Sequence, residues 1–247
     1  MGWRQQGVYI DLTVAPVTKR LLIALIMIFC ATWWLPRLWG GSKAVDDLYT
    51  WLALIPQAVW FSGRIWQLLT YGFLHADPMH LFWNGLQLFF FSNRMERAWG
   101  ARRFFRFYVI CLVGSAAVVA ALSPRSLTPI VGASGALFGV LVAYGLSFKN
   151  ELVWFLFVPM RAGVMVMILV GMNLILLGTP DRVSYGIHLS GAVIGLLWVR
   201  GLNGFRLWGR DVRYGWAWLL AKWRLRRMRK GFKIVGRSDG SNPHRYH

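Results

Sequence analysis

The chain contains repeated apolar runs close to the roughly 20 residues that a helix needs to cross a bilayer. These runs begin at about Leu21, His80, Phe104, Gly132, Gly163 and Val183. Because 57% of the 247 residues are hydrophobic, a water-soluble fold of this size would leave much apolar surface uncovered. The sequence therefore predicts an all-α polytopic membrane protein, a bundle of about six transmembrane helices.

The basic residues predict which side of the membrane each connection faces. The chain has 28 Lys and Arg against 9 Asp and Glu. The basic residues gather before the first run (Arg4, Lys19, Arg20), in segments 94–106 and 149–161, and beyond Arg200. Cytoplasmic loops are the ones enriched in Lys and Arg. We therefore expect both termini in the cytoplasm, in a multi-pass protein of a bacterial inner membrane.

The chain is expected to form one transmembrane domain, residues 1–203, followed by a tail, residues 204–247. A net charge of +19 could indicate a nucleic-acid partner in a soluble protein. The tail alternates Trp with Arg, which suits a helix on an anionic lipid leaflet, so we predict lipid contact and no nucleic acid. Between the first two helices, segment 36–78 holds short apolar, Trp-containing pieces and is predicted to be a long structured outer loop.

The polar side chains within the apolar runs are costly there and mark candidate functional positions. They are His80, Asn84, Ser134, Asn173 and His188. No Asp or Glu lies inside a run, which argues against an aspartyl protease, a zinc protease and a proton-coupled carrier. Cys30 and Cys111 lie in the middle of apolar runs, so we expect no disulfide, metal or cofactor.

Ser134 lies in the segment IVGASGALFG, residues 130–139, at the start of a helix entering from outside. Its small neighbours leave the hydroxyl approachable. By itself the motif is more typical of helix packing, since Gly and Ser are common between membrane helices. A packing role and a nucleophile both fit these residues.

His188 precedes a Gly-x-x-x-Gly face made by Gly191 and Gly195, and the serine helix carries the same spacing at Gly135 and Gly139. Such faces let two backbones come close. Both helices are predicted to run from outside to inside, so packing of the faces would bring the two side chains to one depth. This predicts a Ser134 nucleophile with His188 as its base; the alternative is a histidine that only binds a carbonyl.

His80 and Asn84 are four residues apart and share one helix face at the outer end of the second run. An Asn amide is a common donor to an oxyanion, and His80 could donate beside it. The alternative is that Asn84 only links helices. His75 lies outside this face and is interpreted as a loop residue.

Together these motifs resemble those of rhomboid intramembrane serine proteases, over about residues 66–200. The family patterns His-x-x-x-Asn, Gly-x-Ser-Gly and His-x-x-Gly-x-x-x-Gly are similar to residues 80–84, 132–135 and 188–195. The resemblance implies that Ser134 attacks, that His188 is base and then acid, and that Phe138 stacks on the base. It also implies an oxyanion site of Asn84, His80 and the Ser134 N–H. The outer loop and the fifth helix are both candidates for a gate, the fifth helix through the resemblance alone.

Other positions match or depart from the family. Glu96 and Gly100 resemble its Glu-x-x-x-Gly, a structural motif, whereas Gln67 and Ile187 stand where Arg and Ala are usual. We expect a serine endopeptidase that cleaves transmembrane segments of other proteins near their outer ends. The alternatives are a catalytically silent relative that binds and escorts transmembrane helices, and a small-solute transporter.

Overall fold

The computed structural model describes residues 13–34, 43–155, 158–179 and 182–202. The predicted tail and Arg4 lie outside them. The first half contains α1 (Pro16–Phe29), η1 (Cys30–Trp34), α3 (Lys43–Leu52), α4 (Pro56–Phe61), α5 (Gln67–Thr70), η2 (Tyr71–Phe73), α6 (Pro78–Gln87), η3 (Leu88–Ser92) and α7 (Asn93–Trp99). The second half contains α8 (Ala101–Leu122), α9 (Ser134–Ser147), β1 (Leu152–Phe155), β2 (Val158–Arg161), α10 (Ala162–Leu176), α11 (Arg182–Leu197) and η4 (Trp198–Leu202).

Three helical segments of the described residues are long and apolar enough to cross a membrane. They are Pro16–Trp34, Ala101–Leu122 and Val183–Gly201. Helices α9 and α10 are apolar but shorter, and α6, η3 and α7 follow one another without a break over residues 78–99. The fold is thus mostly helical with membrane-spanning helices, while the count of about six spans stays a prediction.

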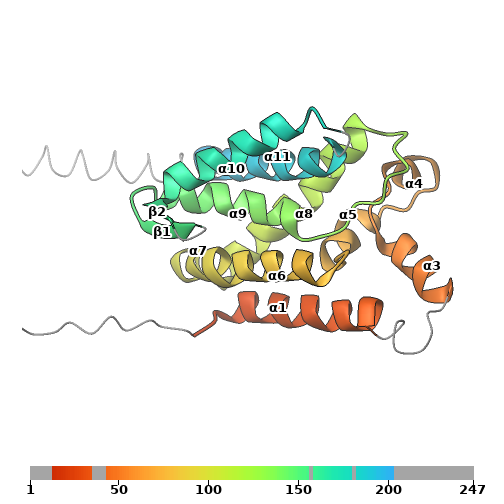
Figure 1. Ribbon diagram of the computed structural model, residues 1–247, viewed down its shortest axis with the longest axis horizontal. Helices are drawn as coiled ribbons and strands as arrows, with labels where there is room; N and C mark the ends of the chain where they lie inside the picture. The colour runs from red at the N-terminus through yellow and green to blue at the C-terminus, as the bar shows by residue number, and fades with distance from the viewer. Residues whose placement is uncertain (1–12, 35–42, 156–157, 180–181, 203–247) are drawn as a thin grey trace, which may run out of the picture. The chain divides into compact units, whose positions relative to one another are not determined.

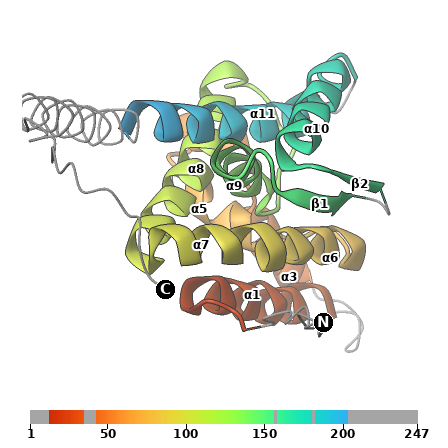
Figure 2. The same ribbon diagram turned by 90° about the vertical axis from the view of Figure 1, so that its left-hand side faces the viewer.

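Helix α9 is the centre of the bundle. Figure 2 shows it among α8, α10, α11 and the α6–α7 segment, and the helix contacts agree. Every residue from Gly135 to Gly145 is buried. A helix that meets protein on all sides has no polar face, which explains why the sequence from Gly135 to Gly145 is apolar apart from one tyrosine hydroxyl.

Helices α9 and α11 touch through their glycines. A Cβ placed on Gly191 would lie 1.8 Å from the Gly135 carbonyl oxygen, and one on Gly195 would lie 2.5 Å from that of Gly139. No side chain fits in these gaps. Since the pairing advances in the same direction along both chains, the two helices run parallel.

Backbone hydrogen bonds from distant segments hold the stretch that leads into α9. Leu54 and Ile130 exchange N–H···O bonds of 3.0 and 2.9 Å, and the Gly132 N–H donates to the Tyr71 carbonyl at 3.0 Å. The buried Gln67 accepts from the Ile55 N–H at 3.0 Å and donates to the Trp51 carbonyl. Gln67, which stands where Arg is usual, therefore links α3 to the start of α4, beside the backbone bridge between Leu54 and Ile130.

Glu96 and Gly100 have local structural roles at the other end of the bundle. The buried Glu96 carboxylate accepts from the N–H groups of Val17 and Thr18 and from the Thr18 hydroxyl, at 2.8–2.9 Å. It therefore caps the N-terminus of α1, where a negative charge is favourable. Gly100 has φ +83°, a conformation that favours glycine, and it turns the chain from α7 into α8.

The connection between α9 and α10 contains an antiparallel hairpin of β1 and β2, with Leu152 opposite Arg161. The sequence does not predict it, because its strands are only four residues long and lack a clear alternation. Figure 1 shows the hairpin at one end of the bundle and α3 and α4 at the other.

Candidate active site

Ser134 and His188 form a direct hydrogen bond. Ser134 is the first residue of α9, and its Oγ lies 2.8 Å from Nε2 of His188 on α11. Both residues are only partly buried. The close approach of the helix backbones at Gly135 and Gly191 brings the two side chains together. A serine hydroxyl bonded to imidazole can transfer its proton as the oxygen attacks an electrophile.

The imidazole of His188 is held on two further sides. Its ring stacks on Phe138, with centroids 4.4 Å apart and planes 5° from parallel. Its Nδ1 lies 2.9 Å from Oδ1 of Asn173 on α10. The sequence marks Asn173 as a polar residue in an apolar run but assigns it no role, because the rotation of α10 about its axis is not readable from one sequence.

His80 and Asn84 lie against the backbone two residues before Ser134. A Cβ on Gly132 would be 2.6 Å from the His80 Nε2 and 3.8 Å from the Asn84 Nδ2. Gly132 also has φ +114°, so a residue with a side chain would be strained and would collide with the His80 ring. The structure thus brings both predicted oxyanion residues to the serine segment.

Several hydrogen-bond donors are available around Ser134. The Asn84 Nδ2 donates one N–H to the His80 carbonyl at 2.9 Å, which leaves its second N–H. Because α9 begins at Ser134, its first N–H groups have no partner within the helix. These groups could stabilise negative charge that develops next to Ser134.

His75 lies in the loop between η2 and α6, as predicted, but its side chain is buried beside His80. Its side chain is 0% exposed, and its ring meets that of His80 edge-on, with centroids 5.0 Å apart. Neither ring nitrogen has a hydrogen-bond partner among the described residues. Burial, with the nearby His80 as a smaller cause, lowers the pKa of His75 to about 3. His75 is therefore neutral at physiological pH.

An apolar cavity of about 550 Å³ adjoins the base-stacking ring. Its lining includes Trp83 from α6, Phe138 from α9, Leu169 from α10 and residues of the β1 strand. The Oε1 atom of Gln87, which also lines this cavity, is buried without a partner among the described residues. One end of the cavity thus reaches Phe138, which touches His188.

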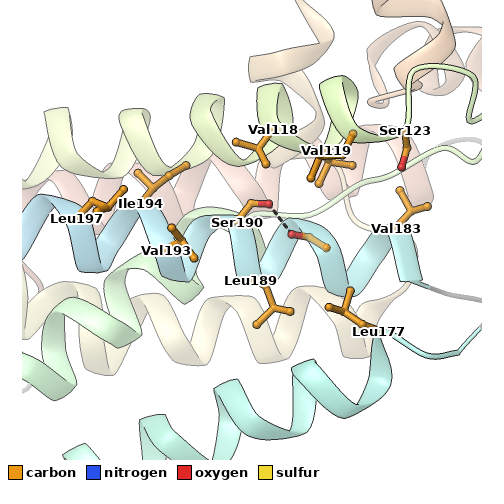
Figure 3. A pocket seen from close by; sticks show the side chains of 12 residues that line it. Val118, Val119, Ser123, Leu177, Val183, Leu189, Ser190, Val193, Ile194 and Leu197 are labelled. Atoms are coloured by element: carbon orange, nitrogen blue, oxygen red, sulfur yellow. Dashed lines mark hydrogen bonds between the residues drawn. The ribbon is translucent and has the colours of Figure 1, made fainter.

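A second cavity, of about 600 Å³, lies between α8 and α11 (Figure 3). Ser134 and His188 are not among the residues that line it. The Ser190 hydroxyl in its wall donates to the Gly186 carbonyl at 2.7 Å, as Figure 3 shows. This cavity is separate from the Ser134–His188 pair.

Within the described ranges, no three His, Cys, Asp or Glu side chains are grouped as a metal site requires. Cys30 is exposed and Cys111 is buried, and both are free thiols. The groups that converge on Ser134 are imidazole, amide and backbone N–H groups.

Comparison with known proteins agrees with the motif pattern. The family model of the Rhomboid domain matches residues 62–203. The chain is 33% identical over 151 residues to RHOMBOID-like protein 4 of Arabidopsis thaliana, which covers 61% of this chain and 36% of that protein. It is 35% identical over 108 residues to Rhomboid protease GluP of Bacillus subtilis, covering 42% and 20%.

A third relative, Rhomboid protein 1, mitochondrial, of Saccharomyces cerevisiae, is 26% identical over 191 residues, covering 73% of this chain and 52% of that protein. This chain thus spans about half or less of the length of each of these relatives. The family model alone matches more than half of the chain. This integral membrane protein therefore belongs to the rhomboid family.

Proposed function

We propose that this protein is an intramembrane serine endopeptidase that cleaves transmembrane segments of other membrane proteins. The observation that carries the proposal is the 2.8 Å hydrogen bond between the Ser134 Oγ and the His188 Nε2. The stacked Phe138 ring supports it, since it restrains the plane of the base. One relative, GluP, is named as a rhomboid protease.

In the first half of the reaction, the Ser134 Oγ attacks the carbonyl carbon of the scissile peptide bond and gives its proton to the His188 Nε2. The carbonyl oxygen becomes negative. The Ser134 N–H, the second Asn84 N–H and the His80 ring are the candidate donors to it. Loss of one such donor typically raises the barrier by about 3–4 kcal/mol.

Collapse of this intermediate breaks the C–N bond, and His188 returns the proton to the leaving amine. The product is an ester between the Ser134 Oγ and the acyl carbon. Water then attacks the same carbon and gives a proton to the His188 Nε2. The bond between this carbon and the Ser134 Oγ breaks, and His188 returns the proton to Oγ. The partial exposure of Ser134 and His188 is consistent with access for this water.

The apolar cavity beside Phe138 supports a transmembrane helix as substrate. Its lining offers apolar side chains along α6, α9 and α10, and it adjoins the reactive pair through Phe138. The amides of a helix are already hydrogen-bonded, so a few residues must unwind before attack. The free Oε1 of Gln87 could accept one N–H of the unwound stretch. Substrates with Gly, Ala or helix breakers near the site are therefore favoured.

The described structure supports the proposed topology, with the reactive pair toward the outer side. Arg94 pairs with Glu151 at 3.3 Å, and the Tyr144 hydroxyl donates to Glu151 at 2.8 Å. The two basic connections, 94–106 and 149–161, therefore meet at one end of α9, and Ser134 is at its other end. The bacterial inner membrane stays a prediction, since the relatives come from a plant and from yeast mitochondria as well as from a bacterium.

The test uses purified wild-type protein, Ser134→Ala and His188→Ala in detergent, with a fluorophosphonate probe and a transmembrane reporter. The wild type should become labelled and cut the reporter, and both variants should do neither. Labelling and cleavage by the variants at the wild-type rate would contradict the proposal. Reporter binding without cleavage by the wild type would favour the silent, helix-binding alternative.

A further inference from the structure

Asn173 and His188 meet through a contact whose direction can be worked out from the structure. The Asn173 Nδ2 donates to the Leu169 carbonyl at 2.9 Å, and its Oδ1 lies 2.9 Å from the His188 Nδ1. A carbonyl only accepts hydrogen bonds, so the Asn173 nitrogen must be the end that faces Leu169. The amide oxygen is then the end that faces the imidazole.

This orientation determines which tautomer of His188 is present. An amide oxygen only accepts, so the His188 Nδ1 must carry a hydrogen. A neutral imidazole has one N–H, which leaves a lone pair on Nε2. That lone pair faces the Ser134 Oγ at 2.8 Å. The Asn173 oxygen thus selects the form of His188 that can accept the serine proton.

The stacking contact with Phe138 cannot do this alone. Stacking fixes the plane of the ring, but a half-turn about the Cβ–Cγ bond leaves the ring in the same plane. That half-turn exchanges a nitrogen with a carbon on each side. Ser134 on the Nε2 side and Asn173 on the Nδ1 side both favour the observed orientation. A hydroxyl can donate or accept, so of the two only the Asn173 oxygen, which can only accept, also selects the tautomer.

The burial of Asn173 in an otherwise apolar helix agrees with its hydrogen bond to His188. It is 7% exposed and is the only polar side chain in the sequence of α10. Its neighbours Met172 and Leu174 are 50% and 57% exposed, as expected for side chains that face lipid. Helix α10 is therefore rotated so that its one amide faces inward, where a polar group requires a partner.

We infer that Asn173 is a positioning residue for His188. Ser134, His188 and Asn173 then form a hydrogen-bonded chain whose third member is neutral. The inference rests on the proposed protease function. A carboxylate does this in other serine hydrolases, and no acid is needed here because the amide oxygen accepts the same N–H. The imidazolium formed during attack keeps this bond, since both of its nitrogens donate.

The test compares Asn173→Leu, which removes the acceptor at similar size, with Asn173→Asp, which keeps an oxygen facing Nδ1. Leu174→Ala, on the lipid-facing side of the same turn, is the matched control. For Asn173→Leu we expect kcat to fall about 10- to 100-fold, the range known for groups that orient metal-binding histidines, with KM within about twofold. Asn173→Asp should retain more of the wild-type kcat, and Leu174→Ala all of it.

The second measurement is the ¹⁵N NMR spectrum of the imidazoles, which would not change if Asn173 only packed against its neighbours. The chain has 5 His, and His188→Gln identifies the His188 signal. In the wild type, Nδ1 should be protonated and Nε2 bare, and Asn173→Leu should show mixed tautomers. Protonated Nε2 in the wild type, or a fall in kcat with the tautomer unchanged, overturns the inference.

This measurement separates the inference from the protease proposal. A wild-type protein that neither reacts with fluorophosphonate nor cuts the reporter would refute the protease, whereas the wild-type tautomer would still decide the role of Asn173. Should Asn173→Leu fail to fold, Asn173→Asp and the wild-type spectrum decide it.

Discussion

Substitution of Gly191 by Ala should break the hydrogen bond between Ser134 and His188 while the protein stays folded. The added Cβ would lie 1.8 Å from the Gly135 carbonyl oxygen and 2.8 Å from its carbon, whereas Cβ atoms do not approach other atoms closer than about 3.0 Å. Helices α9 and α11 must therefore separate locally by more than about 1 Å. The obstructing atoms are backbone, so no rotamer change relieves the clash.

This separation of the helices increases the distance between Ser134 and His188. Gly135 is the residue after Ser134, and Gly191 lies one turn after His188. A shift of this size takes the 2.8 Å Ser134–His188 distance to about 4 Å, beyond hydrogen-bond range. Misplacement by about 1 Å typically lowers a rate about 100-fold, or about 2.7 kcal/mol of barrier. Overpacking should also lower the free energy of unfolding by about 1–3 kcal/mol.

The assay compares Gly191→Ala with two other glycine variants of α11. Gly195→Ala would place its Cβ 2.5 Å from the Gly139 oxygen, one turn further from the dyad, so it should destabilise the protein but slow cleavage less. In Gly186→Ala the Cβ lies 3.7 Å from a Val119 methyl, an ordinary contact, so both properties should stay near wild type. Thermal unfolding in detergent, fluorophosphonate labelling and reporter cleavage are measured for each.

Two outcomes would refute this reasoning. Gly191→Ala with wild-type labelling and cleavage would mean that α9 and α11 tolerate separation without loss of the hydrogen bond. Equal losses in Gly191→Ala and Gly186→Ala would mean that any methyl group on α11 is harmful, irrespective of the gap.

Two further predictions concern the second helix and the loop before it. Asn84→Ala should lower kcat about 100-fold with KM nearly unchanged, because its N–H would be used only in the transition state; unchanged kcat would remove Asn84 from the oxyanion site. Burial lowers the pKa of His75 from 6.5 in the unfolded chain to about 3 in the folded protein, so below pH 6.5 the unfolded state binds one more proton. The free energy of unfolding should therefore fall by up to about 1.4 kcal/mol per pH unit from pH 6.5 toward pH 3. Thermal unfolding of His75→Phe should depend less on pH than that of the wild type; melting temperatures that fall in parallel with pH would contradict this.

Much of the fold class can be read from the sequence, because its signals are local. Apolar runs of transmembrane length are a property of consecutive residues, and they predict a mostly helical membrane protein with α1, α8 and α11 among its spans. The rhomboid family is predicted from short motifs and confirmed by the family model. The glycine spacings at residues 135–139 and 191–195 also predict two faces that admit a close neighbour.

The site is readable only in part. The sequence predicts that Ser134 and His188 lie at one depth, because the basic loops predict the direction of the helices and each residue precedes a glycine face. The structure puts the two within hydrogen-bond distance, and their catalytic roles stay predictions. Residues 80 and 84 share a face by helical periodicity alone, but their position over Gly132 depends on how α6 packs against the serine segment.

Three features are decided only by the tertiary structure. The β1–β2 hairpin has strands too short for a periodic signal. The burial of His75 depends on the segment that folds over it. The Asn173–His188 bond depends on the rotation of α10. A sequence records which residues share one face of a helix, but which face meets which neighbour follows from the packing of all helices together, and that packing gives His188 its third partner.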